Sequence, residues 1–124
     1  MLEALQAMSS VILDPFLLLL IFATTIIGVI IGVLPGIGAT TGAALLLPFT
    51  LTMTPVHAIT VLATIYVSAT FAGSITAILI NTPGTSAAAA TTFDGFPLAQ
   101  RGEAGRALGV AVVSSTVGGL SLIH

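Results

Sequence analysis

Charge is the scarcest property of this sequence. Of 124 residues only 5% are Asp, Glu, Lys or Arg, whereas ordinary globular domains contain about 25%. Two basic and four acidic side chains cannot cover the surface of a water-soluble domain. Because 56% of the residues are hydrophobic, the composition predicts an integral membrane protein whose solvent is the lipid bilayer.

Cysteine and lysine are also absent, and each absence excludes a class of function. Without cysteine there are no disulfide bonds and no thiolate metal sites. Two arginines form no basic patch, so no nucleic-acid partner is expected. With two histidines and no carboxylate pair, the sequence offers no nucleophile and base that act together. We therefore expect no enzyme, no catalytic residue and no cofactor.

Long apolar runs predict membrane helices at about residues 16–34, 55–81 and 104–123. No positive residue precedes the first run and no small-residue cleavage site follows it, so we interpret it as a retained helix and not as a signal peptide. Gly28 and Gly32 form a small-xxx-small pair that predicts a helix-packing groove. The second run is either one long helix or two segments that meet near Gly73. The third reaches the last residues, so the chain is expected to be the first part of a larger protein.

Two Pro-Gly sequences predict breaks in the helices. Pro35-Gly36 ends the first run, and residues 39–48 that follow are too few to span a bilayer. They predict a half-helix or re-entrant segment, which is tolerated at membrane depth only when it is buried or lines a cavity. Pro83-Gly84 ends the second run. A short helix at 85–92, a turn at 94–97 and a surface loop through residue 106 are expected to follow, with the loop in the cytoplasm because it carries both arginines.

These features predict an all-α, polytopic membrane protein that forms a single domain over residues 1–124. Several short motifs then resemble those in the large membrane subunit of the tripartite tricarboxylate transporters. The order and spacing of the motifs also resemble the pattern of that family. The motifs are Gly32-Val33-Leu34-Pro35-Gly36-Ile37-Gly38, Ala44-Leu45-Leu46-Leu47-Pro48, Met53-Thr54-Pro55, Ile65-Tyr66, Gly73-Ser74-Ile75-Thr76-Ala77-Ile78-Leu79-Ile80-Asn81-Thr82-Pro83-Gly84, Asp94-Gly95-Phe96-Pro97 and Gly105-Arg106-Ala107-Leu108.

The resemblance implies a subunit of a secondary transporter in the bacterial inner membrane that imports di- or tricarboxylates with Na⁺ or H⁺. It also implies two protein partners, a small membrane subunit and a periplasmic solute-binding protein. The sequence departs from the family pattern at four positions: Thr64, Ser68 and Ala72 stand where glycine is common, and Phe96 stands where tyrosine is common.

No cation lies deep within the apolar runs, at membrane depth, to receive a carboxylate. The helix N-termini that follow each break offer amide donors and partial positive charge instead, and carbonyls freed at the breaks could hold Na⁺ near Asn81 and Thr82. No firm metal site is expected. The predicted substrate- or ion-binding residues lie at or beside the two breaks: Gly36, Gly38, Thr40, Thr41, Ser74, Asn81, Thr82, Gly84, Thr85 and Ser86.

Structural roles compete with these assignments. For Ser74, Thr76 and Thr85, a hydrogen bond to a backbone carbonyl is as strongly expected as a role in the site. Asp94 is expected to cap a loop more than to carry a coupling proton. His57 is interpreted as an exposed interfacial residue in preference to a proton relay. A non-transporting scaffold, whose small residues serve only helix association, is the alternative to a transporter.

Overall fold

The computed structural model describes residues 1–122, and all regular secondary structure in that range is helical. The elements in chain order are α1 (Leu2–Ile12), α2 (Pro15–Val33), α3 (Gly38–Thr50), α4 (Pro55–Ile80), the 3₁₀ turn η1 (Ser86–Ala88), α5 (Thr91–Gln100) and α6 (Ala104–Ser121). The predicted all-helical membrane architecture is confirmed. The bounds of α2, α3 and α4 lie within two residues of the ranges expected from the sequence, and the end expected for α6 lies partly outside the described residues.

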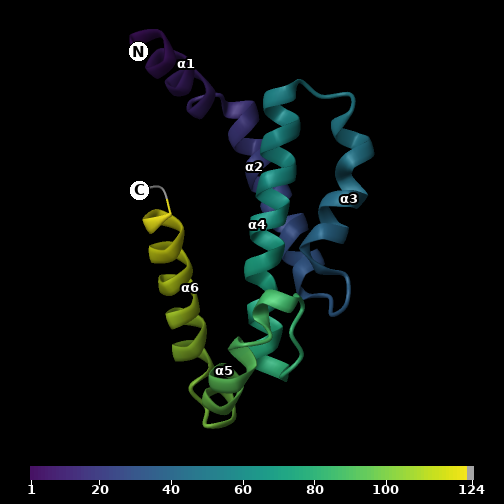
Figure 1. The fold of residues 1–124 in the computed structure, drawn as a ribbon, viewed down its shortest axis with the longest axis vertical. Coiled ribbons are helices and arrows are strands. Elements are labelled where there is room, and N and C mark those ends of the chain that lie inside the picture. Colours follow the sequence, from purple (N-terminus) through teal and green to yellow (C-terminus); the bar gives the residue numbers. More distant parts are fainter. Residues whose placement is uncertain (123–124) are drawn as a thin grey trace.

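Helices α2 and α4 form the centre of the fold and run in the same direction (Figure 1). Helix α3, which connects them in the chain, runs in the opposite direction and packs beside α4. Helix α4 is one continuous helix of 26 residues, about 39 Å long at 1.5 Å per residue. It is therefore not divided at Gly73. Helix α2 has 19 residues and stops short of the far end of α4.

The parallel pair is held by close backbone packing at Gly28 and Gly32. A Cβ atom built on Gly28 would lie 1.9 Å from Ser68 Oγ, and one on Gly32 would lie 2.2 Å from the carbonyl oxygen of Ala69. No side chain fits in either position, so the glycines bring the two helix backbones together. The predicted packing groove is confirmed.

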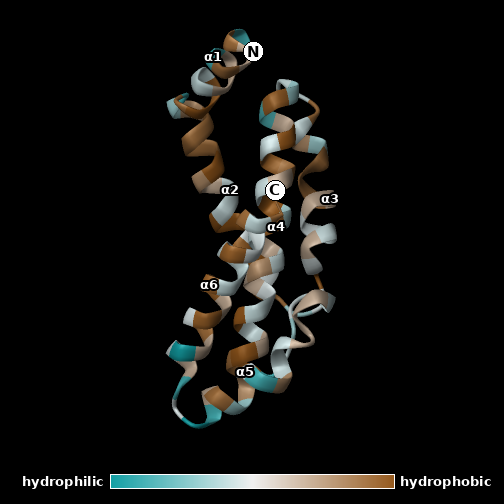
Figure 2. Ribbon diagram, turned by 60° about the vertical axis from the view of Figure 1, so that its left-hand side comes forward, coloured by the Kyte–Doolittle hydropathy of each residue, from teal (hydrophilic) through white to brown (hydrophobic). Residues whose placement is uncertain are grey.

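Helices α2 and α4 are long and apolar enough to cross a membrane, with mean hydropathies of 2.8 and 1.7. Helix α6 was expected to be a third such helix, but it does not qualify over its described residues. It contains Arg106 and the polar run Ser114-Ser115-Thr116. Many large apolar side chains of α2 are exposed. Hydrophilic residues gather mainly at the two ends of the fold (Figure 2). This distribution suits a protein surrounded by lipid or by further apolar protein surface.

The predicted turn at Asp94–Pro97 was wrong, because α5 passes through it. Gly95 is buried, and a Cβ there would lie 2.6 Å from Ile78 Cγ1. Packing of this glycine against α4 favours the helix over the turn that its sequence prefers. Pro97 inside the helix removes one intrahelical hydrogen bond and crowds the carbonyl four residues earlier, so α5 forms against this local preference. The expected surface loop is consequently reduced to residues 101–103, and the short helix expected at 85–92 is only the single turn η1.

Candidate functional site

The first break lies between α2 and α3. Leu34 has an extended conformation, and Gly36 and Gly38 have φ angles of +90° and +68°. Glycine adopts these left-handed angles without the strain that a side chain adds, so the Pro-Gly-Ile-Gly sequence reverses the chain there. Helix α3 begins at Gly38 without a side-chain cap, and Thr40 and Thr41 in its first turns are exposed.

The second break begins with a left-handed residue at the end of α4. Asn81 has φ 55° and ψ 27°, a conformation that asparagine tolerates better than most residues. The carbonyl of Thr76 accepts a hydrogen bond from the amide of Thr82 over 3.3 Å, which closes the helix end. The carboxamide of Asn81 is exposed and forms no hydrogen bond within residues 1–122. Thr82 donates its hydroxyl to the carbonyl of Ile80 over 3.2 Å.

After Pro83 the chain folds back onto the crossing of α2 and α4. The amide of Gly84 donates to the carbonyl of Gly73 over 3.3 Å. A Cβ on Gly84 would lie 2.1 Å from the carbonyl oxygen of Gly32 and 2.9 Å from the Cα of Gly73. Three backbone segments therefore meet where only glycine fits. Because Gly32 stands in the last turn of α2, the second break contacts the helix end that leads into the first.

Thr85 supplies a buried polar group at this crossing. A Cβ on Gly73 would lie 2.7 Å from Thr85 Oγ1, so the threonine side chain covers that glycine. The hydroxyl oxygen is buried and has no hydrogen-bond partner among the described residues. A buried, unpaired hydroxyl costs about 1–3 kcal/mol. The alternative that Thr85 bonds a backbone carbonyl is not what the structure shows. Thr76, by contrast, does donate to the carbonyl of Gly73.

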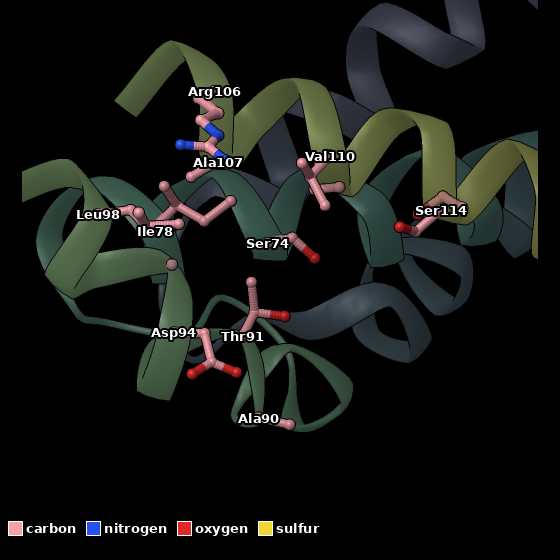
Figure 3. A pocket seen from close by; sticks show the side chains of 13 residues that line it. Ser74, Ile78, Ala90, Thr91, Asp94, Leu98, Arg106, Ala107, Val110 and Ser114 are labelled. Atoms are coloured by element: carbon pink, nitrogen blue, oxygen red, sulfur yellow. The ribbon is translucent and has the colours of Figure 1, made fainter. Parts of the chain in front are cut away.

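Beyond Thr85 the chain forms one wall of a pocket of about 480 Å³ between α4, α5 and α6. Figure 3 shows the hydroxyls of Ser74 and Thr91 directed into the same space, with Arg106 at one end and Ser114 at the other. A second pocket of about 350 Å³ adjoins it, lined by Ala87 and Ala88. Ser74 and Ser115 line both pockets. The polar residues of the larger pocket are Ser74, Thr91, Asp94, Arg106, Ser114 and Ser115.

The structure brings together only part of the predicted set. Gly84 and Thr85 meet at the glycine crossing, and Ser74 lines the pockets beside them. Asn81, Thr82 and Ser86 are exposed along the same break. The remaining residues, from the first break, line neither of these two pockets: Gly36, Gly38, Thr40 and Thr41. The backbones of the two breaks therefore approach each other, while the hydroxyls of the first do not face those of the second in a shared cavity.

Sequence reasoning missed the pocket residues Thr91, Arg106 and Ser114. Arg106 was assigned to a surface loop because it lies close to the other charged residues. In the structure it stands in the first turn of α6, where it turns toward α4 and α5. The available signal was the spacing of Ala107, Ala111, Ser114 and Gly118, which places small residues along one face of a helix.

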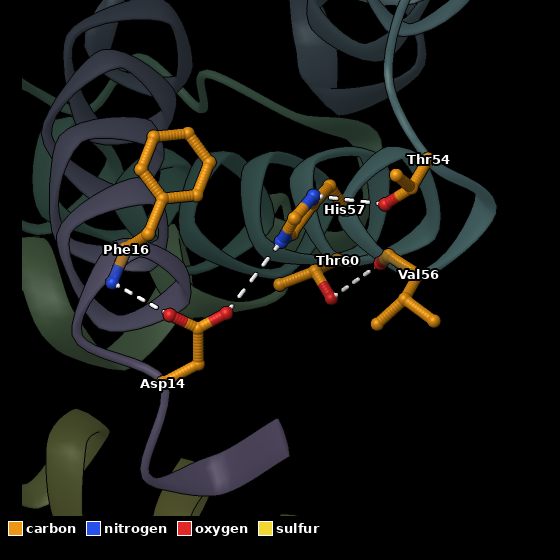
Figure 4. A network of polar contacts seen from close by, with 6 residues as sticks. All are labelled: Asp14, Phe16, Thr54, Val56, His57 and Thr60. Carbon is orange, nitrogen blue, oxygen red and sulfur yellow. Dashed lines mark hydrogen bonds and ion pairs between the residues drawn. The ribbon is translucent and has the colours of Figure 1, made fainter. Parts of the chain in front are cut away.

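A separate polar cluster joins the starts of α2 and α4 (Figure 4). Asp14 caps α2 by accepting the Phe16 amide at 2.9 Å, and its other oxygen lies 3.9 Å from His57 Nε2. Thr54 is the N-cap residue of α4, but its hydroxyl contacts His57 Nδ1 at 2.8 Å and bonds no backbone amide of the helix. His57 also packs edge-on against Phe16, with 5.3 Å between the ring centroids. It is half-buried, so the expectation of an exposed histidine was wrong.

The described residues contain no group of three or more His, Asp or Glu side chains that could hold a metal ion. Na⁺ near Asn81 and Thr82 stays a prediction, because its expected ligands include backbone carbonyls. Of the carbonyls there, that of Thr76 already accepts the amide of Thr82.

Comparison with known proteins decides the family. The model of the tripartite tricarboxylate transporter TctA family matches residues 18–123. The chain belongs to this family. It is also 45% identical over 107 residues to an uncharacterized 52.8 kDa protein in the TAR-I ttuC' 3'region of Agrobacterium vitis. That match covers 86% of this chain and 21% of the relative, so this TctA family member spans about a fifth of the length of its relative. No solved structure matches the chain.

Proposed function

We propose that this chain forms part of the membrane subunit of a secondary transporter that imports di- or tricarboxylates. Membership in the tripartite tricarboxylate transporter family supports this function. In this proposal a periplasmic solute-binding protein delivers the substrate and a small membrane subunit completes the complex. Transport across the bacterial inner membrane is coupled to Na⁺ or H⁺, and residues 101–103 lie on the cytoplasmic side.

The observation that carries the proposal is the second break and its position. Non-helical backbone at membrane depth is tolerated only where it is buried in protein or lines a cavity. Here α4 ends at Ile80, Gly84 returns to Gly73, and the following residues line the pocket that contains Ser74. Interrupted helices with freed backbone groups beside a cavity are the usual substrate and ion sites of secondary transporters.

The test is uptake of radiolabelled citrate, used as a representative tricarboxylate, by cells that express the complete protein with its two partner subunits. We expect uptake that requires all three components. Collapse of one of the two gradients, Na⁺ or proton, should abolish it while collapse of the other does not, and the gradient that is required identifies the coupling ion. Citrate accumulation that is unchanged when the complete protein is omitted would contradict the proposal and favour a non-transporting scaffold.

A further inference from the structure

The pocket between α4, α5 and α6 is lined by one positively charged side chain. Arg106 extends from the first turn of α6 and lines the pocket together with Ile78 and Leu98 (Figure 3). Of the two arginines in the chain it is the one that lines this pocket, because Arg101 at the end of α5 does not. The guanidinium group has a planar set of donors that matches a carboxylate.

This guanidinium is available to a ligand. Its one ion pair within residues 1–122 is with Glu103, at 3.5 Å and three residues earlier on the chain. Both side chains are largely exposed, at 73% for Arg106 and 45% for Glu103. Exposed pairs of this kind contribute little, about 0–1 kcal/mol. A carboxylate that enters the pocket can therefore replace Glu103 at small cost.

The rest of the pocket suits a small organic acid. Apolar side chains form much of the wall, and the hydroxyls of Ser74 and Thr91 converge from α4 and α5. Asp94 lines the pocket on the side away from α6 (Figure 3). Its carboxylate disfavours a second negative group there, so the acid group of a ligand is directed to the Arg106 end. A few convergent polar groups in an apolar cavity are typical of ligand sites.

We propose that a carboxylate group of the transported acid binds to Arg106 in this pocket, while Ser74 and Thr91 hydrogen-bond its remaining polar atoms. This inference rests on the proposed transport function and adds the place and the residue that receive the substrate. It differs from recognition by helix ends alone, because a basic side chain takes part.

Two matched arginine variants of the complete protein test the proposal. Arg106→Gln should raise the half-saturating citrate concentration for uptake about tenfold or more, since a hydrogen bond to a charged group contributes about 1.5–3 kcal/mol. Arg101→Gln should leave it unchanged. Arg106→Lys should give an intermediate value, because lysine keeps the charge and loses the two-pronged geometry. Membrane abundance of each variant is measured in parallel.

Equal half-saturating concentrations for Arg106→Gln and Arg101→Gln would overturn the inference while leaving the transport function intact. If the unmodified complex takes up no carboxylate, the proposed function itself fails, and the two failures are thereby distinguished.

A labelling experiment does not depend on the arginine. Val110 lines the pocket and Val112, two residues later, does not, although both are exposed. In a cysteine-free background, citrate should slow maleimide labelling of Val110→Cys and have no effect on Val112→Cys. Equal labelling of Val110→Cys with and without saturating citrate would contradict the proposed site.

Discussion

The amide of Gly84 donates a hydrogen bond to the carbonyl of Gly73, and this contact folds the second break back onto α4. At the same point Gly84 touches the carbonyl of Gly32 in α2. The break is thus held by two helices at once. The direction in which the chain leaves the break sets the positions of η1 and α5. These two elements in turn set the walls of the pocket.

Gly84→Ala should disturb this crossing. The added methyl group would lie 2.1 Å from a backbone oxygen that cannot move without shifting α2. We expect a loss of about 1–3 kcal/mol in stability, as for other overpacked sites, together with loss of citrate uptake. Thermal unfolding of the purified complete protein measures the first effect. Gly105→Ala is the control, because a Cβ there meets nothing within 4 Å. A Gly84→Ala protein as stable as the control would show that the backbones do not meet.

Gly28 and Ser68 should show coupled effects on stability. Gly28→Ala places a methyl group 1.9 Å from the Ser68 hydroxyl and should lower the unfolding temperature. Ser68→Gly removes the obstructing side chain. The double variant should therefore be more stable than Gly28→Ala alone. Additive losses in a double-mutant cycle would contradict direct contact between these positions.

Asp14 should stabilise α2 chiefly as its cap. Asp14→Ala removes the acceptor for the Phe16 amide and should cost about 1 kcal/mol. Asp14→Asn keeps a good capping residue and loses the charge near His57. We expect most of the stability to survive in the asparagine variant, because the 3.9 Å ion pair is partly exposed and weak. Equal losses in thermal unfolding for both variants would assign the effect to the ion pair.

A test of Asn81 requires a substitution that removes the carboxamide without straining the left-handed backbone. Alanine would strain the left-handed residue and delete the carboxamide together, whereas glycine keeps φ near 55° without strain. If the carboxamide serves the substrate or ion, as we expect for an unpaired amide in a membrane segment, Asn81→Gly should lose uptake while inserting normally. Uptake at the unmodified rate by Asn81→Gly would leave Asn81 with a structural role only.

The helix breaks and the close helix contact of this fold were predictable from the sequence. Pro35 and Pro83 with their glycines predicted the two breaks, and the short run between the first break and Pro48 predicted a helix shorter than α2 and α4. Gly28 and Gly32 predicted the packing groove. Each of these depends on backbone chemistry within a few residues.

The pocket was not predictable in the same way. It forms because Gly84 returns to Gly73, because Gly95 packs on Ile78, and because α6 turns Arg106 toward α4. All three are contacts between segments far apart in the chain. The packing of Gly95 on Ile78 also overrode the turn preference of Asp94–Pro97. Thr40 and Thr41, in α3, do not line the pocket.

A density map of the complete protein bound to citrate tests the account most directly. We predict that Gly84 rests on Gly32 and Gly73, and that citrate lies between Ser74 and Arg106 with one carboxylate against the guanidinium. A continuous helix through Pro83, or citrate bound away from both Ser74 and Arg106, would contradict it.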